Sequence, residues 1–519
     1  MKNSGKILRA GFWLILIGSI ALGYFKITES SQTDHFKYIP KQVDGVMVLD
    51  GRQISKKLVE RYRFDPSGLE AILPKEALDG DDVQLENIGI DPFYKIPVFH
   101  FQIDKKYFIA GLIKCDTKLF LKHFKQRYGD ELIEIYNSLE SGVVCQRYQS
   151  KNQDVTICAG LGVGIYCSTV DGNVLSDSGN QALMTYLVSA LEDPQDGLAA
   201  VNPYFASFIS EKEDIGYWSN GKTKGFGALI NGFTDSRTFF SFEKGAVEIA
   251  SELEYADESP LKSSIRPLNI DAPFAFSFMA NERESWSFIE QNIPTGFQHF
   301  FQNYNGNFFF EIKGHQLFQG FHMEDSIDIE TFDSYEVIVP NKKLTPFPKF
   351  VTVFGMNDVA GYLDNLNADS TYLLNKGYYE FDLINGVQCF LKVLDSNICI
   401  SNSKACIEEI AMKPIADLYA TYSLRLDFIA LKESLPVKGD LGIGVPNMIV
   451  QTGFELLNFE SVQIDVTEIQ ENTVRGKGSF KFKNHEAHSL VALLDMMNLA
   501  ISNRGIIEAM LLQSDRPIE

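Results

Sequence analysis

The stretch Gly45-Val46-Met47-Val48-Leu49-Asp50 reads as an apolar strand that ends at an aspartate, and apolar residues at helical spacing follow it, namely Ile54, Leu58 and Tyr62. The same order of strand, Asp or Asn, and helix recurs at Asp116, Asn281 and Asp358. Asp and Asn are favoured helix N-caps, because the side chain accepts a hydrogen bond from a first-turn amide, worth about 1 kcal/mol. We therefore interpret all four corner residues as caps, in preference to catalytic carboxylates.

These units fall into two halves of the chain that repeat in order. Asn281 lies 231 positions after Asp50, and Asp358 lies 242 positions after Asp116. The predicted strand turns at Gly245 and Asn472 are 227 positions apart. The pattern predicts an α+β fold with two similar domains from an internal duplication, each a mostly antiparallel, curved sheet with helices packed on one face.

Length and composition agree with two domains. A chain of 519 residues exceeds the size at which one hydrophobic core keeps growing, and 45% hydrophobic with 12% aromatic residues excludes a disordered chain. We predict a basic tip, an apolar segment and a linker in residues 1–33, a first repeat domain in 34–265, and a second in 266–519. Apolar residues between 490 and 511 predict C-terminal helices in the second domain.

The N-terminus predicts export. An uncharged apolar run covers residues 10–25 and is flanked by basic residues, which are Lys2, Lys6, Arg9 and Lys26. We favour a retained single-pass anchor with residues after 26 on the non-cytoplasmic side, in the periplasm or cell envelope. A cleaved, exported form is the alternative, with cleavage after Ala21-Leu22-Gly23.

The exported part is strongly acidic. After residue 26 the chain has 43 basic and 68 acidic residues, a net charge of −25. Phosphate backbones are bound by clustered Lys and Arg, so this composition argues against nucleic acid as a partner. The expected contacts are the membrane through residues 10–25, and an envelope protein partner or an apolar ligand.

Seven cysteines lie mostly within apolar strands, namely Cys115, Cys145, Cys158, Cys167, Cys389, Cys399 and Cys406. An odd number leaves at least one unpaired within the monomer. Most resemble small buried hydrophobic residues. Cys158 with Cys167, and Cys389 with Cys399, are the disulfides that predicted antiparallel neighbours allow.

No motif in the chain assigns a reaction. His485-Glu486-Ala487-His488 is one residue short of the metalloprotease spacing, and we interpret it as the start of a surface helix. Gly160-Leu161-Gly162-Val163-Gly164 lacks dinucleotide spacing and predicts a hairpin turn and strand. We assign no catalytic, cofactor-binding or metal-ligating residue and expect no cofactor.

Aromatic residues are dense between 297 and 323, where Asn305-Gly306-Asn307 predicts a turn between a helix and a strand. Such a stretch is typical of a domain core, which we favour, and also of an apolar ligand groove.

Three segments support a resemblance: Tyr38-Ile39-Pro40 with Val46 to Asp50, Phe240 to Gly245, and Ala272-Pro273-Phe274-Ala275-Phe276. Over residues 34–500 the chain resembles large, two-halved bacterial envelope proteins of a domain-of-unknown-function family. The resemblance implies an exported or lipid-anchored α+β protein and carries no catalytic residues. This chain lacks a cysteine after the apolar run, so it departs from the lipid-anchored members.

We expect a non-enzymatic, membrane-anchored envelope protein that binds or scaffolds another envelope component through a cleft between its halves or an open sheet face. The alternatives are a carrier of a lipid or other apolar ligand, and a hydrolase with a site assembled in space.

Overall fold

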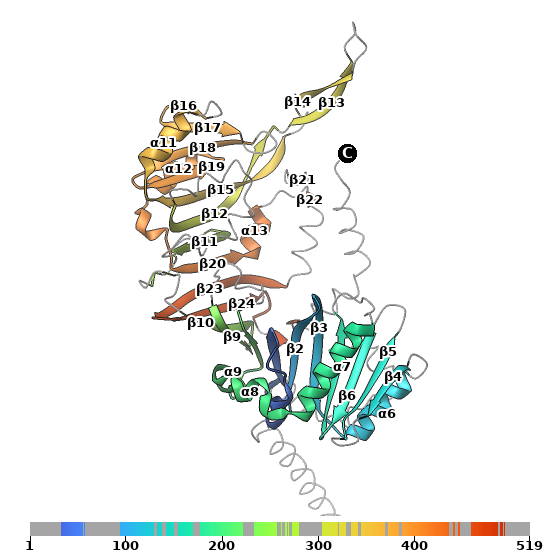
Figure 1. Ribbon diagram of the computed structural model, residues 1–519. Coiled ribbons are helices and arrows are strands. Elements are labelled where there is room, and N and C mark those ends of the chain that lie inside the picture. The colour runs from blue at the N-terminus through green and yellow to red at the C-terminus, as the bar shows by residue number, and fades with distance from the viewer. Residues whose placement is uncertain are drawn as a thin grey trace, which may run out of the picture. The chain divides into compact units, whose positions relative to one another are not determined.

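The structure is a computed structural model that describes residues 33–54, 57, 94–128, 132–137, 142–149, 154–169, 177–221, 233–256, 261, 265, 266, 268, 272–279, 304–319, 321–327, 334–340, 344–368, 372–382, 387–434, 440, 441, 445, 446, 458–485, 488–490, 492 and 493. It divides into two compact units (Figure 1). Unit 1 comprises residues 1–223 and 234–242, and unit 2 comprises 224–233 and 243–519. No described helix is long and apolar enough to cross a membrane, and residues 10–25 lie outside the described part.

Unit 1 contains nine strands among its described residues, which are β1 (Gly45–Asp50), β2 (Lys95–Ile103), β3 (Lys106–Lys114), β4 (Leu132–Asn137), β5 (Val144–Gln149), β6 (Asp154–Gly160), β7 (Val163–Thr169), β8 (Ile215–Ser219) and β9 (Phe233–Phe242). Its helical elements are η1 (Asp34–Tyr38), α6 (Thr117–Tyr128), α7 (Asp177–Glu192), η3 (Pro194–Asp196), α8 (Leu198–Val201) and α9 (Pro203–Phe208). The strands are all antiparallel and follow the order β4-β5-β6-β7-β3-β2-β1-β8-β9.

Unit 2 contains the strands β10 (Ala246–Tyr255), β11 (Phe274–Met279), β12 (Tyr304–Phe318), β13 (Phe321–Ile327), β14 (Ser334–Pro340), β15 (Thr345–Met356), β16 (Leu373–Asn375), β17 (Tyr378–Asp382), β18 (Gln388–Leu394), β19 (Asn397–Ser401), β20 (Tyr422–Asp427), β21 (Asp440–Leu441), β22 (Val445–Pro446), β23 (Phe459–Gln470) and β24 (Thr473–Phe482). Its helical elements are α11 (Val359–Ala368), α12 (Lys404–Ala411), η8 (Ile415–Asp417) and α13 (Phe428–Ser434). Its main sheet is also antiparallel, in the order β16-β17-β18-β19-β15-β12-β11-β20-β23-β24-β10.

The two main sheets use the same order of strands along the chain. In unit 1, β1 pairs with β2 and with the late strand β8, and the block β4–β7 extends beyond β3. In unit 2, β11 pairs with β12 and with the late strand β20, and the block β16–β19 extends beyond β15. The helix α6 follows β3, as α11 follows β15. The helix α7 follows β7, as α12 follows β19. α6 therefore corresponds to α11, and α7 corresponds to α12. Unit 2 additionally inserts the hairpin β13-β14 between β12 and β15.

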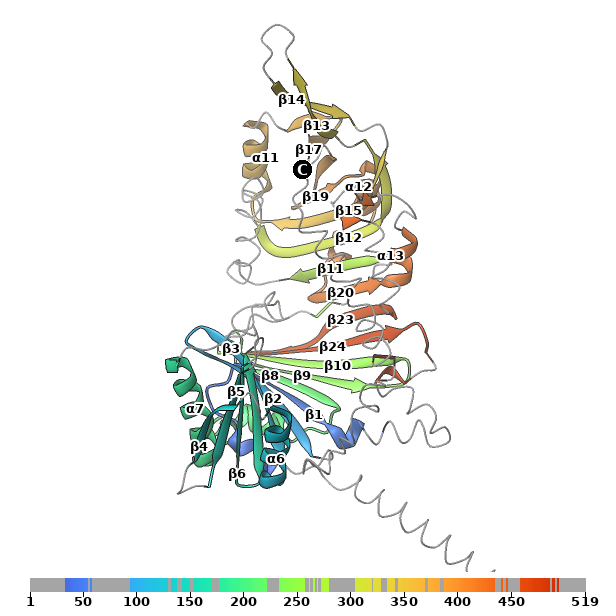
Figure 2. The same cartoon turned by 90° about the vertical axis from the view of Figure 1, so that its right-hand side faces the viewer.

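The prediction of an α+β fold with mostly antiparallel sheets is confirmed, but the placement of helices on one face is wrong. In unit 1, Cys158 belongs to the core beneath α7, whereas its neighbours Ile157 and Ala159 belong to the core beneath α6. Adjacent strand residues point to opposite faces, so the two helices cover opposite faces. Figure 2 shows α6 and α7 on either side of β4–β6, and α11 and α12 are arranged likewise in unit 2.

The boundary between units also differs from the sequence repeat. The repeat places it at 265/266, whereas the compact units divide at 242/243 after a short exchange at 224–233. β10 explains the shift, because it pairs along nine residues with β24 of unit 2.

Tight turns fix the registers of the hairpins. Leu161 and Gly162 connect β6 to β7 with φ values of 55° and 80°, and Asp104 and Lys105 connect β2 to β3 with 49° and 64°. Positive φ at both central residues matches the right-handed twist of the flanking strands. The predicted turn in the Gly160–Gly164 stretch is confirmed.

We expect Gly164→Ala to lower the free energy of unfolding of unit 1 by about 1–3 kcal/mol, because α6 packs tightly on β7 there. A Cβ at Gly164 lies 2.5 Å from the ring of Phe120, which is fully buried. Gly111→Ala on β3 is the matched control, since its Cβ meets nothing within 4 Å. Pulsed thiol labelling of Cys115, a buried free cysteine in unit 1, measures the loss. Equal stability of the two variants contradicts this packing.

Candidate functional site

A groove of about 540 Å³ lies in unit 1 between α7 and the strands β4 and β5, of which β4 ends the described sheet. Its lining residues come from one flank of α7 and from the two strands, and they are Tyr136, Arg147, Asn180, Gln181, Met184, Thr185, Val188, Ser189 and Glu192. A helix is about 10 Å wide and strands lie about 4.8 Å apart, so one helix covers only about two strands. The sheet extends past α7 at β4 and β5, and the groove lies at this margin.

α7 is held over the sheet by its opposite flank. Leu183, Leu187 and Leu191 are at most 2% exposed and belong to the core cluster that contains Phe99 and Phe101 of β2. The groove side of the helix instead exposes Gln181, Thr185 and Ser189, which recur every four residues. The helix therefore has one flank committed to the core and one that presents polar groups to the groove.

Arg147 is the buried charge of the groove. It is 5% exposed and lies opposite Glu134 on β4 and Thr156 on β6. The next residue, Tyr148, faces the core beneath α6, so the Arg147 side chain faces α7. Burying a guanidinium is costly unless it is paired, and Arg147 does keep a partner within the protein.

The remaining lining combines apolar and polar groups. Met184 and Val188, each 7% exposed, supply the apolar wall, and Glu192 lies at the C-terminal end of α7. The Thr185 hydroxyl donates to the carbonyl of Gln181 at 2.8 Å. A concave site of several hundred Å³ with a few fixed polar groups is typical of ligand binding. Sequence reasoning missed this site, although a lone arginine in the apolar strand at 143–148 is a signal for it.

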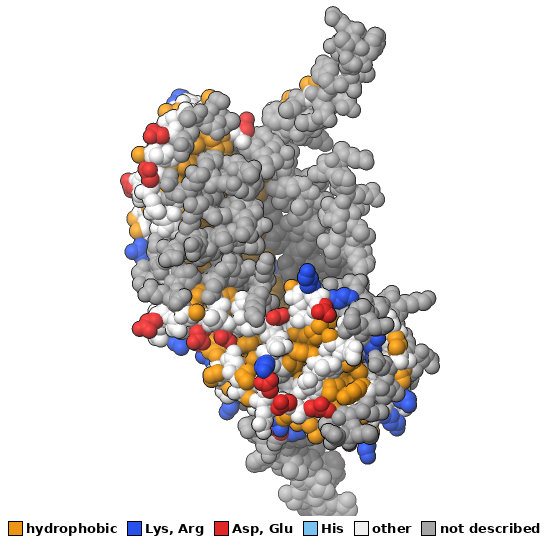
Figure 3. All heavy atoms as spheres, viewed as in Figure 1, with side chains coloured by type: hydrophobic (Ala, Val, Ile, Leu, Met, Phe, Trp, Pro, Cys, Tyr) orange, Lys and Arg blue, Asp and Glu red, His pale blue; other side chains and the backbone are white. Residues whose placement is uncertain are grey.

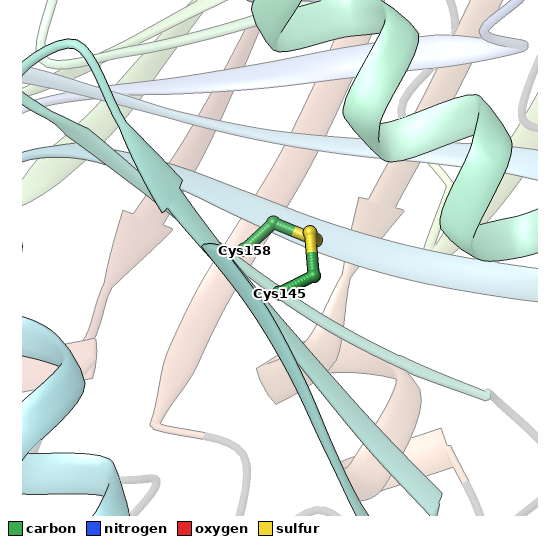
Figure 4. The surroundings of a disulfide bond; sticks show 2 residues. All are labelled: Cys145 and Cys158. Carbon is green, nitrogen blue, oxygen red and sulfur yellow. A yellow bond between two sulfur atoms is a disulfide. The ribbon is translucent and has the colours of Figure 1, made fainter. Parts of the chain in front are cut away.

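A disulfide braces the floor of the groove. Cys145 and Cys158 lie opposite each other on β5 and β6, with their Cα atoms 4.0 Å apart (Figure 4). Cys145 also lies opposite Tyr136 of the groove and two residues before Arg147 on the same face. The bridge thus fixes the strand that carries the buried arginine.

Both predicted cysteine pairs are wrong. Cys167 lies opposite Thr156 and not opposite Cys158, while Cys389 lies opposite Phe381 and Cys399 opposite Lys392. The registers therefore keep these thiols apart. The free cysteines are all buried, as predicted for small hydrophobic residues, and they are Cys115, Cys167, Cys389, Cys399 and Cys406.

The corresponding margin of unit 2 carries a network of charged and aromatic side chains. Lys392 Nζ lies 2.6 Å from Glu408 Oε1, and Lys404 Nζ lies 2.6 Å from Glu380 Oε1. The Lys404 ammonium also lies 4.5 Å from the ring centroid of Phe390. These contacts join α12 to β17 and β18, which correspond to α7, β5 and β6 of unit 1. Side chains thus bridge helix to strand in unit 2, where unit 1 has a groove.

A second charged group in unit 2 is buried within the sheet. Glu311 on β12 is 0% exposed, and Lys313 Nζ lies 2.9 Å from its Oε1. Lys313 also lies 2.6 Å from Glu409 of α12. Burial raises the pKa of Glu311, an effect that Lys313 opposes. Burial acts to lower the pKa of Lys313, but Glu409 and Glu311 together raise it.

A third charged group lies in unit 1, where the last residue of β1 pairs with the first residue of β2. Lys95 pairs with Asp50 in the register and donates to the carbonyls of Ile209, at 2.8 Å, and Glu211. Burial lowers the pKa of Lys95. These bonds join β2 to the segment after α9, so we assign Lys95 a structural role.

Asp214 completes this structural group. It is 1% exposed and accepts hydrogen bonds from Lys57 Nζ at 2.8 Å and from the Phe242 amide at 2.6 Å. Its carbonyl accepts from the Asp50 amide at 2.9 Å. The carboxylate therefore ties three segments of unit 1 together.

The cap interpretation is confirmed where the structure describes the residues. Asp50 accepts from the Gln53 amide at 3.1 Å, Asp116 from the Leu119 amide at 3.0 Å, and Asp358 from the Gly361 amide at 2.9 Å. Asn281 lies outside the described residues. A further cap, which the sequence pattern did not predict, is Asp427 at the start of α13. Its carboxylate accepts a hydrogen bond from the Ala430 amide at 2.8 Å.

Two other sequence motifs have structural roles. His485 Nε2 lies 2.6 Å from Glu460 Oε2, and the Leu490 amide lies 3.3 Å from His488 Nδ1 at a helix start. The predicted helix start is confirmed, but its predicted surface position is wrong, because Ser489 and Leu490 are buried. Asn305-Gly306-Asn307 is not a turn between elements, because it forms an irregularity within β12. The described part of the chain contains no group of His, Cys, Asp and Glu that could hold a metal ion.

The aromatic stretch contributes to the core of unit 2, which favours the core interpretation. Phe309 is fully buried beneath α12, and Tyr304 packs on the opposite face. Residues 297–303 lie outside the described part.

Comparisons with known proteins add no functional information. No family model matches the chain, and no curated protein matches it. Crystal form III of TP0453 is 11% identical, with 46% of this chain and 90% of that chain covered and a TM-score of 0.27. Crystal form I is 11% identical, with 43% and 80% covered and a TM-score of 0.26. These scores support no argument, and the resemblance to envelope proteins stays a prediction.

Proposed function

We propose that the protein is a non-enzymatic, membrane-anchored component of the cell envelope that binds another envelope component in the groove beside α7. The groove carries this proposal, because it combines a suitable volume, an apolar wall and a buried arginine. The disulfide between Cys145 and Cys158 supports an exported location, since cytosolic thiols are kept reduced. Residues 10–25 supply the membrane anchor in this proposal, and the cleaved form is its alternative.

The proposal includes an internal duplication of one ancestral sheet unit. The shared strand order, the matching helices and the sequence offsets support it. Lys392, Lys404, Glu380 and Glu408 bridge helix and strands in unit 2, whereas the margin of unit 1 is hollow. Unit 1 is then the binding half and unit 2 the supporting half.

A carrier of an apolar ligand is the second candidate, and the aromatic face of unit 2 favours it. Phe274 and Phe310 lie on adjacent strands with ring centroids 5.8 Å apart, and the Phe310 and Phe350 centroids are 6.3 Å apart. These rings are only partly buried. A lipid that copurifies with the chain and is lost on Phe310→Ser supports this candidate.

Filling the groove tests the proposed function. We expect Ser189→Trp in the tagged, full-length protein to lose at least 90% of its crosslinked partner in native membranes. The reason is the size of the tryptophan side chain, which buries roughly 150–250 Å² of surface and occupies much of the groove beside α7. Lys122→Trp on α6 is the matched control, since that residue is also exposed on a helix of unit 1. Quantitative mass spectrometry of the captured protein measures the loss. Equal capture by both variants contradicts a binding site in the groove.

A further inference from the structure

We infer that the groove beside α7 takes an extended peptide segment that pairs with the edge of β4 and places a carboxylate on Arg147. This inference rests on the proposed function and names the chemistry of the bound component. It requires an accessible strand edge, a groove long enough for several residues, and a recognition group for the carboxylate.

β4 supplies the strand edge. Among the described strands it pairs only with β5, so no described strand takes up the backbone groups on its other side. Native edge strands are commonly protected by Lys, Pro or a covering element, and Leu132-Ile133-Glu134-Ile135-Tyr136-Asn137 contains neither Lys nor Pro. Ile133 is 53% exposed and Tyr136 is 42% exposed. An extended peptide can add to such an edge by main-chain hydrogen bonds.

The groove has the length for a short extended peptide. Asn180 and Glu192 line it at opposite ends of one flank of α7. Twelve helical steps of 1.5 Å span about 18 Å, which equals about five extended residues at 3.3 Å each. Alternate side chains of a peptide added to β4 point to the α7 side of the sheet, where the groove lies.

Arg147 determines the chemistry of one of those side chains or of the peptide terminus. It lies one strand in from the edge, on the floor of the groove, and the disulfide two residues away fixes its strand. A guanidinium has five N–H donors in a planar fork and binds carboxylates in a bidentate geometry. Met184 and Val188 offer an apolar wall for a neighbouring residue. The ligand pattern is therefore a carboxylate close to an apolar side chain.

Comparison with unit 2 supports the assignment of carboxylate recognition to unit 1. Its edge strand β16 also exposes apolar side chains, with Leu373 at 66% and Leu374 at 63%. However, Lys404 and Glu408 of α12 are paired with side chains of β17 and β18 beside it. An accessible edge alone is thus common to both units, and the buried arginine in an open groove is what distinguishes unit 1.

The test uses fluorescence anisotropy of full-length protein in detergent with four mixtures of pentapeptides of the form Val-Xaa-Val-Xaa-Val. Xaa is Asp and Glu in the acidic mixtures and Asn and Gln in the neutral ones, each with a free or amidated C-terminus. A near-physiological salt concentration limits repulsion by the net charge of −21. We expect carboxylate-bearing mixtures to bind at least about tenfold more tightly than the neutral, amidated mixture. Tight binding of the amidated acidic mixture assigns the carboxylate to a side chain. Tight binding of the neutral mixture with a free C-terminus assigns it to the peptide terminus.

Two controls make the result specific. Arg147→Gln is expected to remove the tenfold preference, and Lys122→Trp is expected to keep it. Backbone N-methylation of the tightest mixture is expected to abolish binding to the wild-type protein, which tests the edge pairing without any variant. Equal binding of acidic and neutral mixtures, no binding of any mixture, or tolerance of N-methylation overturns the inference. If the peptide test fails but Ser189→Trp still loses its native partner in membranes, the proposed function stands and only the peptide inference is overturned. If Ser189→Trp retains its native partner, the proposed function itself is overturned.

Discussion

Lys313→Met is expected to lower the free energy of unfolding of unit 2 by about 3–5 kcal/mol near neutral pH. The reason is Glu311, which is 0% exposed and whose carboxylate lies 2.9 Å from the Lys313 ammonium. Removing one partner of a buried pair leaves an uncompensated charge, and that costs more than the pair contributes. Urea unfolding followed by pulsed thiol labelling of Cys399 and Cys406, which are buried free cysteines of unit 2, measures the loss.

The pH dependence identifies the cause of this loss. Burial already raises the pKa of Glu311, and loss of Lys313 raises it further. A carboxyl group with a folded pKa above its unfolded pKa binds its proton more tightly in the folded state. Its stabilising contribution is therefore present below the unfolded pKa and is lost as the pH rises through the folded pKa. We expect the Lys313→Met deficit to shrink as the pH falls through the folded pKa of Glu311.

Two companion variants separate charge burial from packing. Lys413→Met is expected to cost less than about 0.5 kcal/mol, because Lys413 and Glu409 are exposed partners 3.5 Å apart. Glu311→Leu combined with Lys313→Met is expected to recover most of the lost stability, since apolar replacements of a buried pair are often tolerated. A deficit that is constant with pH, or that persists in the double variant, contradicts the ion-pair explanation.

The second large effect concerns the disulfide beneath the groove. Replacing both Cys145 and Cys158 with alanine is expected to lower the free energy of unfolding of unit 1 by about 3 kcal/mol. The two residues are 13 apart in sequence, and a bridge over such a loop restricts the unfolded chain. Thiol labelling of Cys115 in unit 1 reports the transition, because that residue is free and buried.

Cys167→Ala is the matched control for the disulfide. Cys167 is also fully buried beneath α7, but it forms no disulfide, so its replacement leaves the Cys145–Cys158 bridge in place. We expect it to cost about 1 kcal/mol, since one small buried group is lost. Reductant is expected to destabilise the wild-type protein and Cys167→Ala, and to leave the double variant unchanged. Destabilisation of the double variant by reductant excludes the Cys145–Cys158 bridge as the cause.

The charge distribution on the visible face of unit 1 favours recognition by local groups over long-range electrostatic attraction of a partner. Figure 3 shows acidic and basic side chains interspersed with hydrophobic ones on the visible face of unit 1. Described side chains of both signs therefore share that face. In the proposed function, recognition depends on local groups such as Arg147, which solvent ions screen less because the side chain is buried.

Local signals in the sequence were sufficient for the caps and turns. Asp116 and Asp358 each follow an apolar strand and precede a helical pattern, and both accept a first-turn amide. Leu161-Gly162 carries its own turn chemistry, because glycine adopts positive φ at low cost. These features depend on a few neighbouring residues, so the sequence alone predicts them.

The groove and the buried pair depend on long-range register, which the sequence does not reveal. Arg147 is 5% exposed and lines the same groove as residues of α7 that come more than thirty positions later in the chain. Glu311 is fully buried because it lies between Ala275 of β11 and Val351 of β15. The incorrect cysteine pairs have the same origin, since a shift of register exchanges opposite partners.

The central claim is that the groove beside α7 binds an envelope component, and site-specific photocrosslinking tests it most directly. A benzophenone side chain at Thr185, on the groove flank of α7, is compared with the same group at Lys122 on α6, both in full-length protein in native membranes. We predict one covalent protein adduct from position 185 that is absent from position 122 and that Ser189→Trp abolishes. No adduct at 185, or the same adduct from both positions, contradicts the claim.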